Sequence, residues 1–225
     1  MVAEIVHLDP GLRRDDGLAE SMPSRTRSLL EPFALAAITL PLAVQFHLPT
    51  LWFFAPFLVI TLTRRDYERY GLTWRGCGSL RFHLLVCASI FGPYLLGHYL
   101  FARVFLGREF HFAVAPDFGQ RVLEQMLFIG LSEEFFFRGY AQTELNDFFG
   151  RPFRFLGVQW GWGLIVAAGL FGVCHLIDGD FTRLRTAFFG LFVGWLRERT
   201  QSIAVPAAYH GVANLLYDIM QRSLR

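Results

Sequence analysis

The sequence contains no lysine, so all 21 of its basic residues are arginine. It has only three cysteines, Cys77, Cys87 and Cys174, and their spacing fits neither a disulfide framework nor a metal site. Charged residues make up 18% of the chain and the net charge is +2, which gives no reason to expect a nucleic-acid partner. These shortages exclude a disulfide scaffold and an intrinsically disordered chain.

Apolar side chains are what the sequence has in excess. Hydrophobic residues make up 53% of its 225 residues, and it contains 25 phenylalanines. A soluble domain of this size could not bury so many phenylalanines in one core. We therefore expect an all-α, polytopic integral membrane protein, a bundle of about seven transmembrane helices with a polar cavity. The arginine-rich, lysine-free composition favours a bacterial protein, and hence the cell (inner) membrane.

Stretches without charge predict the membrane spans, because about 20 helical residues cross the bilayer core. Beyond residue 80 the expected spans are 82–102, 120–145, 155–177, 184–198 and 200–217. In the short span 184–198, Gly190 and Gly194 form a small-xxx-small step that lets helices approach closely.

The uncharged residues 32–63 are interrupted by Pro41, Pro49 and Pro56, and they fit either one kinked helix or a hairpin of two short helices. The arginines favour the hairpin, with its turn near residues 47–50. With that hairpin and a cytoplasmic N-terminus, thirteen arginines lie inside and seven outside, as the positive-inside tendency requires. Residues 1–28 have no apolar core of a signal peptide. We expect them to be a polar cytoplasmic tail, followed by one membrane-embedded domain at 29–225.

One apolar segment contains charged residues. Residues 127–140 contain Glu133, Glu134 and Arg138, and ionised groups in mid-membrane normally face a cavity or one another and mark function. Glu134 and Arg138 are four residues apart, so they share a helix face and can pair. Glu133 is rotated by about 100° and is left available as a general base. The run 135–137, three phenylalanines, is expected to be packing and lipid-facing surface.

Two later spans carry possible partners for Glu133. Phe171 and His175 lie one turn apart on one span, and His210 and Asn214 lie one turn apart on another. Hydrolysis of a peptide bond needs a base that takes a proton from water and donors that stabilise the oxyanion. A carboxylate, two imidazoles and an amide can supply both functions without an activated serine.

These motifs, EExxxR, FxxxH and HxxxN in this order on successive spans, resemble the CAAX protease and bacteriocin-processing (CPBP or Abi) family, which includes the type II CAAX prenyl endopeptidases. The resemblance covers residues 120–220, the motif core. It implies a glutamic-type intramembrane protease that uses no cofactor and no metal. The resemblance implies that Glu133 activates water, that His175 orients it or helps to deprotonate it, and that His210 and Asn214 stabilise the oxyanion.

The same resemblance implies supporting roles for Glu134, Arg138 and Phe171. The implied partners are the lipid bilayer and a membrane-associated protein or peptide substrate, with either a CAAX-like tail or a C-terminal sorting signal.

Three alternatives remain open. Glu133, His175 and His210 could hold zinc as a His₂Glu site, although the chain has no HExxH motif. The chain could be a thiol protease with Cys174 as its nucleophile, because Cys174 adjoins His175, although neighbours on a helix point about 100° apart and do not form the usual nucleophile–base pair. The chain could also be a non-catalytic scaffold or immunity protein of the same fold.

Overall fold

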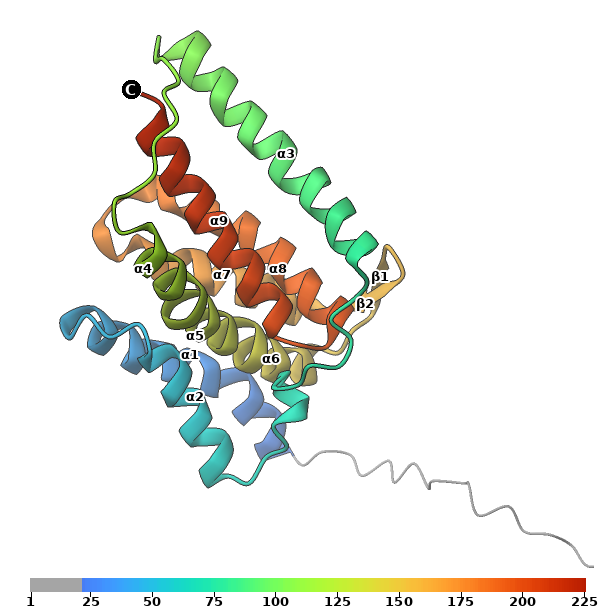
Figure 1. The fold of residues 1–225 in the computed structure, drawn as a ribbon. Helices are drawn as coiled ribbons and strands as arrows, with labels where there is room; N and C mark the ends of the chain where they lie inside the picture. Colours follow the sequence, from blue (N-terminus) through green and yellow to red (C-terminus); the bar gives the residue numbers. More distant parts are fainter. Residues whose placement is uncertain (1–21) are drawn as a thin grey trace, which may run out of the picture.

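The computed structural model describes residues 22–225, and helices make up most of this part of the chain (Figure 1). The expected helical character is confirmed, with one addition, a small two-stranded sheet. The longer helices are α1 (Met22–Gln45), α2 (Leu51–Leu62), α3 (Leu80–Phe105), α7 (Trp162–Cys174), α8 (Thr186–Thr200) and α9 (Ala204–Ser223). Single 3-10 turns cover Glu68–Tyr70, His175–Asp178 and Phe181–Arg185. Of the expected tail at 1–28, residues 1–21 lie outside the described residues, and Met22 already begins α1.

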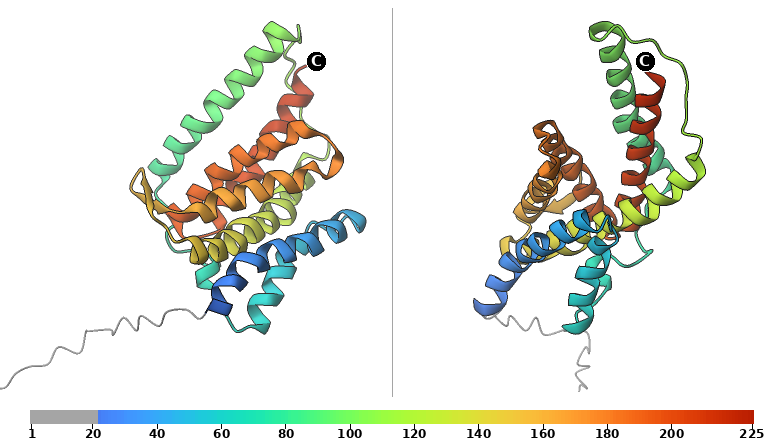
Figure 2. Two further views of the ribbon diagram at one scale, coloured as in Figure 1. Left: turned by 180° about the vertical axis from the view of Figure 1, so that it is seen from behind. Right: turned by 90° about the vertical axis from the view of Figure 1, so that its left-hand side faces the viewer.

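Helices α1 and α2 form the hairpin that the arginine distribution favours. Helix α1 ends at Gln45 and α2 begins at Leu51, so the chain turns where the sequence predicts (Figures 1 and 2). His47 has a φ of 52° in this turn, a left-handed conformation that breaks the helix. The prolines Pro41 and Pro56 are accommodated inside α1 and α2.

A long helical stretch from Phe118 to Phe149 carries the EExxxR motif. It comprises α4 (Phe118–Leu123), a π-helical segment (Glu124–Gly130), α5 (Leu131–Glu134), a second π-helical segment (Phe135–Ala141) and α6 (Gln142–Phe149). The two π-helical segments flank the four residues that contain both glutamates, and such widened turns are frequent at functional sites. The phenylalanines 135–137 are at most 1% exposed, so they are packing residues, and the expectation that they also face lipid is wrong.

Glycines set the spacing of the helices around this stretch. A Cβ on Gly190 would lie 3.1 Å from the Cβ of Ala168, and one on Gly194 would lie 3.0 Å from Leu164 Cγ. The close approach predicted from Gly190 and Gly194 is therefore confirmed, and it brings α8 against α7. On the other side, a Cβ on Gly211 of α9 would lie 3.0 Å from the backbone oxygen of Gln125.

The beginning of the predicted span 155–177 is wrong. Strand β1 (Phe153–Phe155) pairs antiparallel with β2 (Val158–Trp160), and α7 begins only at Trp162. Leu156 and Gly157 have φ values of 48° and 78°, the backbone of a two-residue hairpin turn. Absence of charge marks an apolar segment, but it cannot distinguish a short hairpin from the first turns of a helix.

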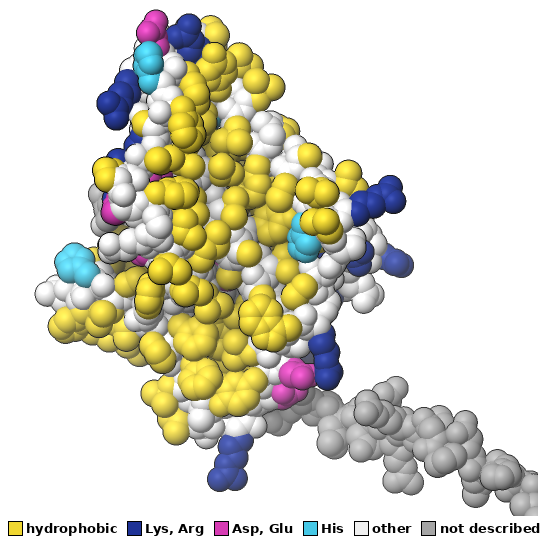
Figure 3. Space-filling view, in the orientation of Figure 1, with side chains coloured by type: hydrophobic (Ala, Val, Ile, Leu, Met, Phe, Trp, Pro, Cys, Tyr) yellow, Lys and Arg dark blue, Asp and Glu magenta, His cyan; other side chains and the backbone are white. Residues whose placement is uncertain are grey.

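By length and composition, two of the described helices could cross a membrane, Arg25–Gln45 and Leu80–Phe105. The apolar helix Leu51–Leu62 is shorter, and so is the apolar stretch Trp162–Ile177. The expectation of seven spans is therefore not confirmed. In Figure 3, hydrophobic side chains cover the middle of the face shown, and arginines project from its edges.

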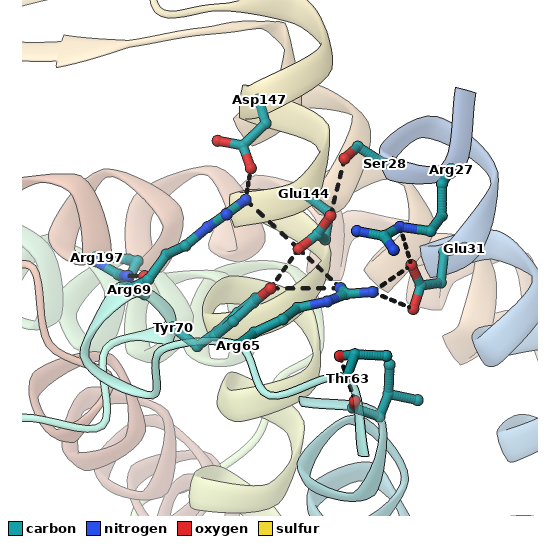
Figure 4. A network of polar contacts seen from close by, with 11 residues as sticks. Arg27, Ser28, Glu31, Thr63, Arg65, Arg69, Tyr70, Glu144, Asp147 and Arg197 are labelled. Carbon is teal, nitrogen blue, oxygen red and sulfur yellow. Dashed lines mark hydrogen bonds and ion pairs between the residues drawn. The ribbon is translucent and has the colours of Figure 1, made fainter. Parts of the chain in front are cut away.

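A buried polar network joins α1, the segment after α2, and α6 (Figure 4). The carboxylate of Glu144 accepts hydrogen bonds from Ser28 (3.0 Å), Arg65 (3.1 Å) and the hydroxyl of Tyr70. Arg65 also donates to both carboxylate oxygens of Glu31 at 2.8 and 2.9 Å. Burial, together with the hydrogen bond to Glu144, raises the pKa of Tyr70 to about 12. The network therefore fixes these three segments to one another at one end of the molecule.

Candidate active site

Glu134 lies at the centre of a fully buried ionic cluster. Its Oε1 is 3.1 Å from Arg138 Nη1, so the pairing predicted from their spacing is confirmed. The same oxygen is 2.7 Å from His210 Nδ1, and because a carboxylate only accepts, the imidazole donates this hydrogen bond. Neither the Glu134 nor the Arg138 side chain has any exposed surface. Glu134 is thus neutralised by two partners, one from its own helical stretch and one from α9.

Arg138 is held by an aromatic ring as well as by its carboxylate. Its guanidinium carbon lies 4.2 Å from the centre of the Phe171 ring, a cation–π contact with α7. Gly190 of α8 leaves room for it, since a Cβ there would lie 3.0 Å from Arg138 Nη2. The guanidinium has no hydrogen-bond partner within the described residues, so the Glu134 charge and the Phe171 ring hold it in place.

Phe171 also positions both histidines. Its ring centre is 4.4 Å from that of His175 and 5.8 Å from that of His210, with edge-to-face geometry in both pairs. The backbone carbonyl of Phe171 lies 2.9 Å from His175 Nδ1, and because a carbonyl only accepts, Nδ1 carries the proton. His175 Nε2 is then left as an acceptor. The FxxxH spacing therefore fixes both the orientation and the tautomer of His175.

Glu133 is less buried than its neighbour and is left without a close partner. Its side chain is 16% exposed, whereas that of Glu134 has no exposed surface. Glu133 Oε2 lies 3.9 Å from His210 Nε2 and has no hydrogen-bond partner within the described residues. The two adjacent glutamates therefore differ as their helical spacing predicts, one paired and the other available.

Glu133 and His175 line one cavity of about 140 Å³, which can hold several water molecules. The side chains that complete its wall are Leu40, Val44, Trp52, Phe137, Cys174, Ile177 and Arg183. Leu40 and Val44 of α1 and Trp52 of α2 thus form part of the cavity wall, and the sequence offered no signal for this contribution. Cys174 and His175 line the cavity together although they are neighbours in the chain.

Asn214 lies apart from this cavity. Its amide nitrogen donates to Gln125 Oε1 at 2.8 Å, and both residues line a second cavity of about 370 Å³. His210 is the residue of α9 that reaches the glutamates. The structure therefore brings the side chains of Glu133, His175 and His210 together. The fourth predicted catalytic residue, Asn214, lies one helical turn beyond His210 on α9. Among the described residues, no three His, Cys, Asp or Glu side chains converge in a group that could hold a metal ion.

Comparison with known proteins bears on the same part of the chain. A family model described as type II CAAX prenyl endopeptidase Rce1-like matches residues 119–216. The resemblance seen in the motifs is confirmed. The matched residues include every motif residue and agree closely with the predicted core of 120–220. The family is one of membrane-embedded proteases. Searches of curated proteins and of solved structures returned no match.

Proposed function

We propose that the chain is an intramembrane endopeptidase that cleaves a membrane-associated protein or peptide tail by metal-free acid–base catalysis. The observation that carries this proposal is the cavity shared by Glu133 and His175. A hydrolase of this kind needs a carboxylate without a permanent partner beside an imidazole with a free acceptor, with space for water between them. The Rce1-like match supports proteolysis as the reaction, and the shared cavity supports Glu133 and His175 as the residues that carry it out.

The proposed reaction begins with a water molecule in this cavity. Glu133 takes one proton from the water while His175 Nε2 accepts a hydrogen bond from its other O–H and orients it. The oxygen attacks the carbonyl carbon of the scissile peptide bond, and the negative charge passes to the carbonyl oxygen. The C–N bond then breaks, and the leaving amine takes the proton held by Glu133.

The oxyanion of the tetrahedral intermediate needs donors, and we assign these to α9. His210 Nε2 faces Glu133, and the Glu134 carboxylate at Nδ1 stabilises positive charge on the ring. Asn214 has two N–H donors, of which Gln125 takes one, so the other is available to the substrate. Glu134, Arg138 and Phe171 position the imidazoles and take no part in proton transfer.

The same proposal covers placement and substrate class. The chain is a multi-pass protein of the cell membrane with a cytoplasmic N-terminal tail at 1–28 and its protease domain at 29–225. Its substrate carries a CAAX-like tail or a C-terminal sorting signal.

The test compares purified wild-type protein with Glu133→Gln and His175→Ala in lipid-containing detergent. The substrates are a farnesylated CAAX peptide and an unprenylated sorting-tail peptide, with products identified by mass spectrometry. Loss of the general base should lower turnover by roughly 10²–10⁴-fold. Glu124→Gln is the matched control, because Glu124 lies on the same helical stretch, is exposed and is not part of the cavity wall. Cleavage by folded Glu133→Gln at the wild-type rate would overturn the proposal, and full activity of Cys174→Ala would exclude the thiol alternative.

A further inference from the structure

An apolar groove of about 590 Å³ lies outside the proposed active site, between α3, the β-hairpin, α7 and α8. Residues that represent its four walls are Ile90 of α3, Phe155 of β1, Leu164 of α7 and Phe192 of α8. Neither Glu133 nor His175 lines it. Figure 2 shows the β-hairpin beside the beginning of α3, at one end of α7 and α8. The groove therefore has the shape and chemistry of a site for a hydrocarbon chain.

A polar cavity of about 530 Å³ lies next to this groove. It is lined by Arg151, Arg154, Arg199 and Glu198, so positive charge exceeds negative charge by two. Glu198 is already satisfied, since it accepts hydrogen bonds from Gln142 and Asn146 at 2.8 Å and from Arg151 at 3.1 Å. Arg151 is thereby fixed, and the remaining positive charge belongs to Arg154 and Arg199.

These two arginines are placed differently. Arg154 is exposed, and its side chain makes no hydrogen bond or ion pair within the described residues. The guanidinium of Arg199 lies 5.8 Å from the ring centre of Phe82, which places it beside α3, the helix that forms one wall of the groove. Both guanidinium groups are therefore available to an anion at the mouth of the groove.

The β-hairpin joins the groove to the arginine cavity. Phe155, Leu156 and Trp160 line the groove, whereas Arg154 and Gln159, which pair across the strands, line the cavity. On α8, the groove residue Trp195 is one turn from Arg199, which lines the cavity. The indole N–H groups of Trp160 and Trp195 are buried without an acceptor in the described part of the chain. Tryptophans with one apolar and one polar edge are typical of the headgroup level of a membrane.

We propose that the groove and the arginine cavity form one binding site for an anionic phospholipid. The phosphate lies against Arg154 and Arg199, and one acyl chain occupies the groove between α3 and α8. Every phospholipid of a membrane has acyl chains that would fill the groove, so the groove alone does not distinguish one lipid from another. The excess of two positive charges at its mouth selects a lipid of net negative charge over a zwitterionic one.

Binding is tested by native mass spectrometry of the purified full chain in detergent, titrated with dioleoylphosphatidylglycerol or dioleoylphosphatidylcholine. The anionic lipid should bind more tightly. Arg154→Gln and Arg199→Gln should each lower its affinity roughly fivefold, the effect of one basic residue near an anionic lipid surface. Affinity for phosphatidylcholine should change much less. Arg75→Gln is the matched control, because Arg75 is 86% exposed and lines neither cavity.

The groove is tested separately with Ser89→Phe, which adds a ring to the α3 wall and should weaken both lipids. Its control is Ala88→Phe, at the exposed neighbouring position that does not line the groove. Thermal melting of each variant confirms that it is folded. Equal binding of the two lipids, or an unchanged affinity in the Arg154→Gln/Arg199→Gln double variant, would overturn the proposal.

Two further results would also contradict it. One is competition by soluble glycerophosphoglycerol as strong as by the lipid, which would mean that the groove contributes nothing. The other is displacement of the lipid by the farnesylated peptide alone, which would make the groove a substrate site. None of these measurements depends on proteolysis, so they remain decisive if the proposed enzymatic activity is absent.

Discussion

At the level of single residues, the two adjacent glutamates offer the sharpest contrast in the protein. Glu134 is enclosed by Arg138 and His210, so Glu134→Ala leaves a buried guanidinium without its counter-charge. Breaking a buried pair in this way costs about 3–5 kcal/mol. We expect Glu134→Ala to lower the detergent melting temperature strongly, and Glu133→Ala to leave it nearly unchanged while abolishing turnover. Equal melting temperatures for the two variants would contradict this division of roles.

Asn214 poses a different question, because its amide contacts Gln125 and lines a separate cavity. If its second N–H stabilises the oxyanion, Asn214→Ala should lower kcat by roughly 10²–10³-fold, leaving a small residual activity. Gln125→Ala removes the partner and keeps the donor, so it should change kcat much less. Single-turnover kinetics of both variants separate the two roles. A similar loss in both would mean that the pair acts only in helix packing.

Contacts within one helix could be predicted from the sequence, and contacts between helices could not. Glu134 and Arg138 pair because four residues make about one turn. The same reasoning places His210 and Asn214 on one face of α9, but it does not say which neighbour each one meets. His210 reaches both glutamates and Asn214 meets Gln125, because glycines on both helices bring α9 against the π-helical segment Glu124–Gly130. Such an approach between segments distant in sequence leaves no periodic signal.

At the level of secondary-structure elements, Gly190 connects helix packing to the site. A side chain there would press on Arg138 Nη2 and on Ala168 of α7. Gly190→Val should therefore destabilise the protein by about 1–3 kcal/mol, the usual cost of overpacking, and lower activity by displacing Arg138 from the Phe171 ring. Gly169→Val is the control, because a Cβ on Gly169 meets nothing within 4 Å. Thermal melting and peptide cleavage are measured for both, and equal losses would contradict a specific role for Gly190.

The elements themselves were predictable to different degrees. The turn between α1 and α2 followed from arginine distribution, and α3 from a long apolar run. The β-hairpin at residues 153–160 was missed because its residues carry the same hydrophobic signal as the helix that follows. The π-helical segments were also missed, since an added residue in a turn depends on tertiary packing around it and not on local propensity.

At the level of the whole molecule, the chain has two polar ends. At one end, the segment after α2 meets α6 and the beginning of α9, through Arg69–Asp147 and a backbone hydrogen bond of 3.0 Å from Ile203 to Gly71. At the other, the loop after α3 meets the C-terminus through hydrogen bonds between the backbones of Glu109 and Arg225. These contacts could not be predicted from the sequence. They gather residues 63–79 and 198–203, which the arginine distribution predicts to lie inside, and, separately, the loop after α3 and the C-terminal residues, which it predicts to lie outside.

This arrangement predicts which positions share a side of the membrane. In a protein whose three cysteines are replaced by serine, Arg75→Cys and Arg154→Cys should be labelled from one side by a membrane-impermeant maleimide. Arg108→Cys, in the loop after α3, should be labelled from the other. Cytoplasmic segments carry an excess of arginine, so Arg75→Cys and Arg154→Cys should face the cytoplasm. They should not react in intact cells, and they should react once the cells are permeabilised. Labelling of Arg75→Cys and Arg108→Cys from the same side would mean that the two polar ends do not face opposite sides of the bilayer, and the positive-inside assignment would then be wrong.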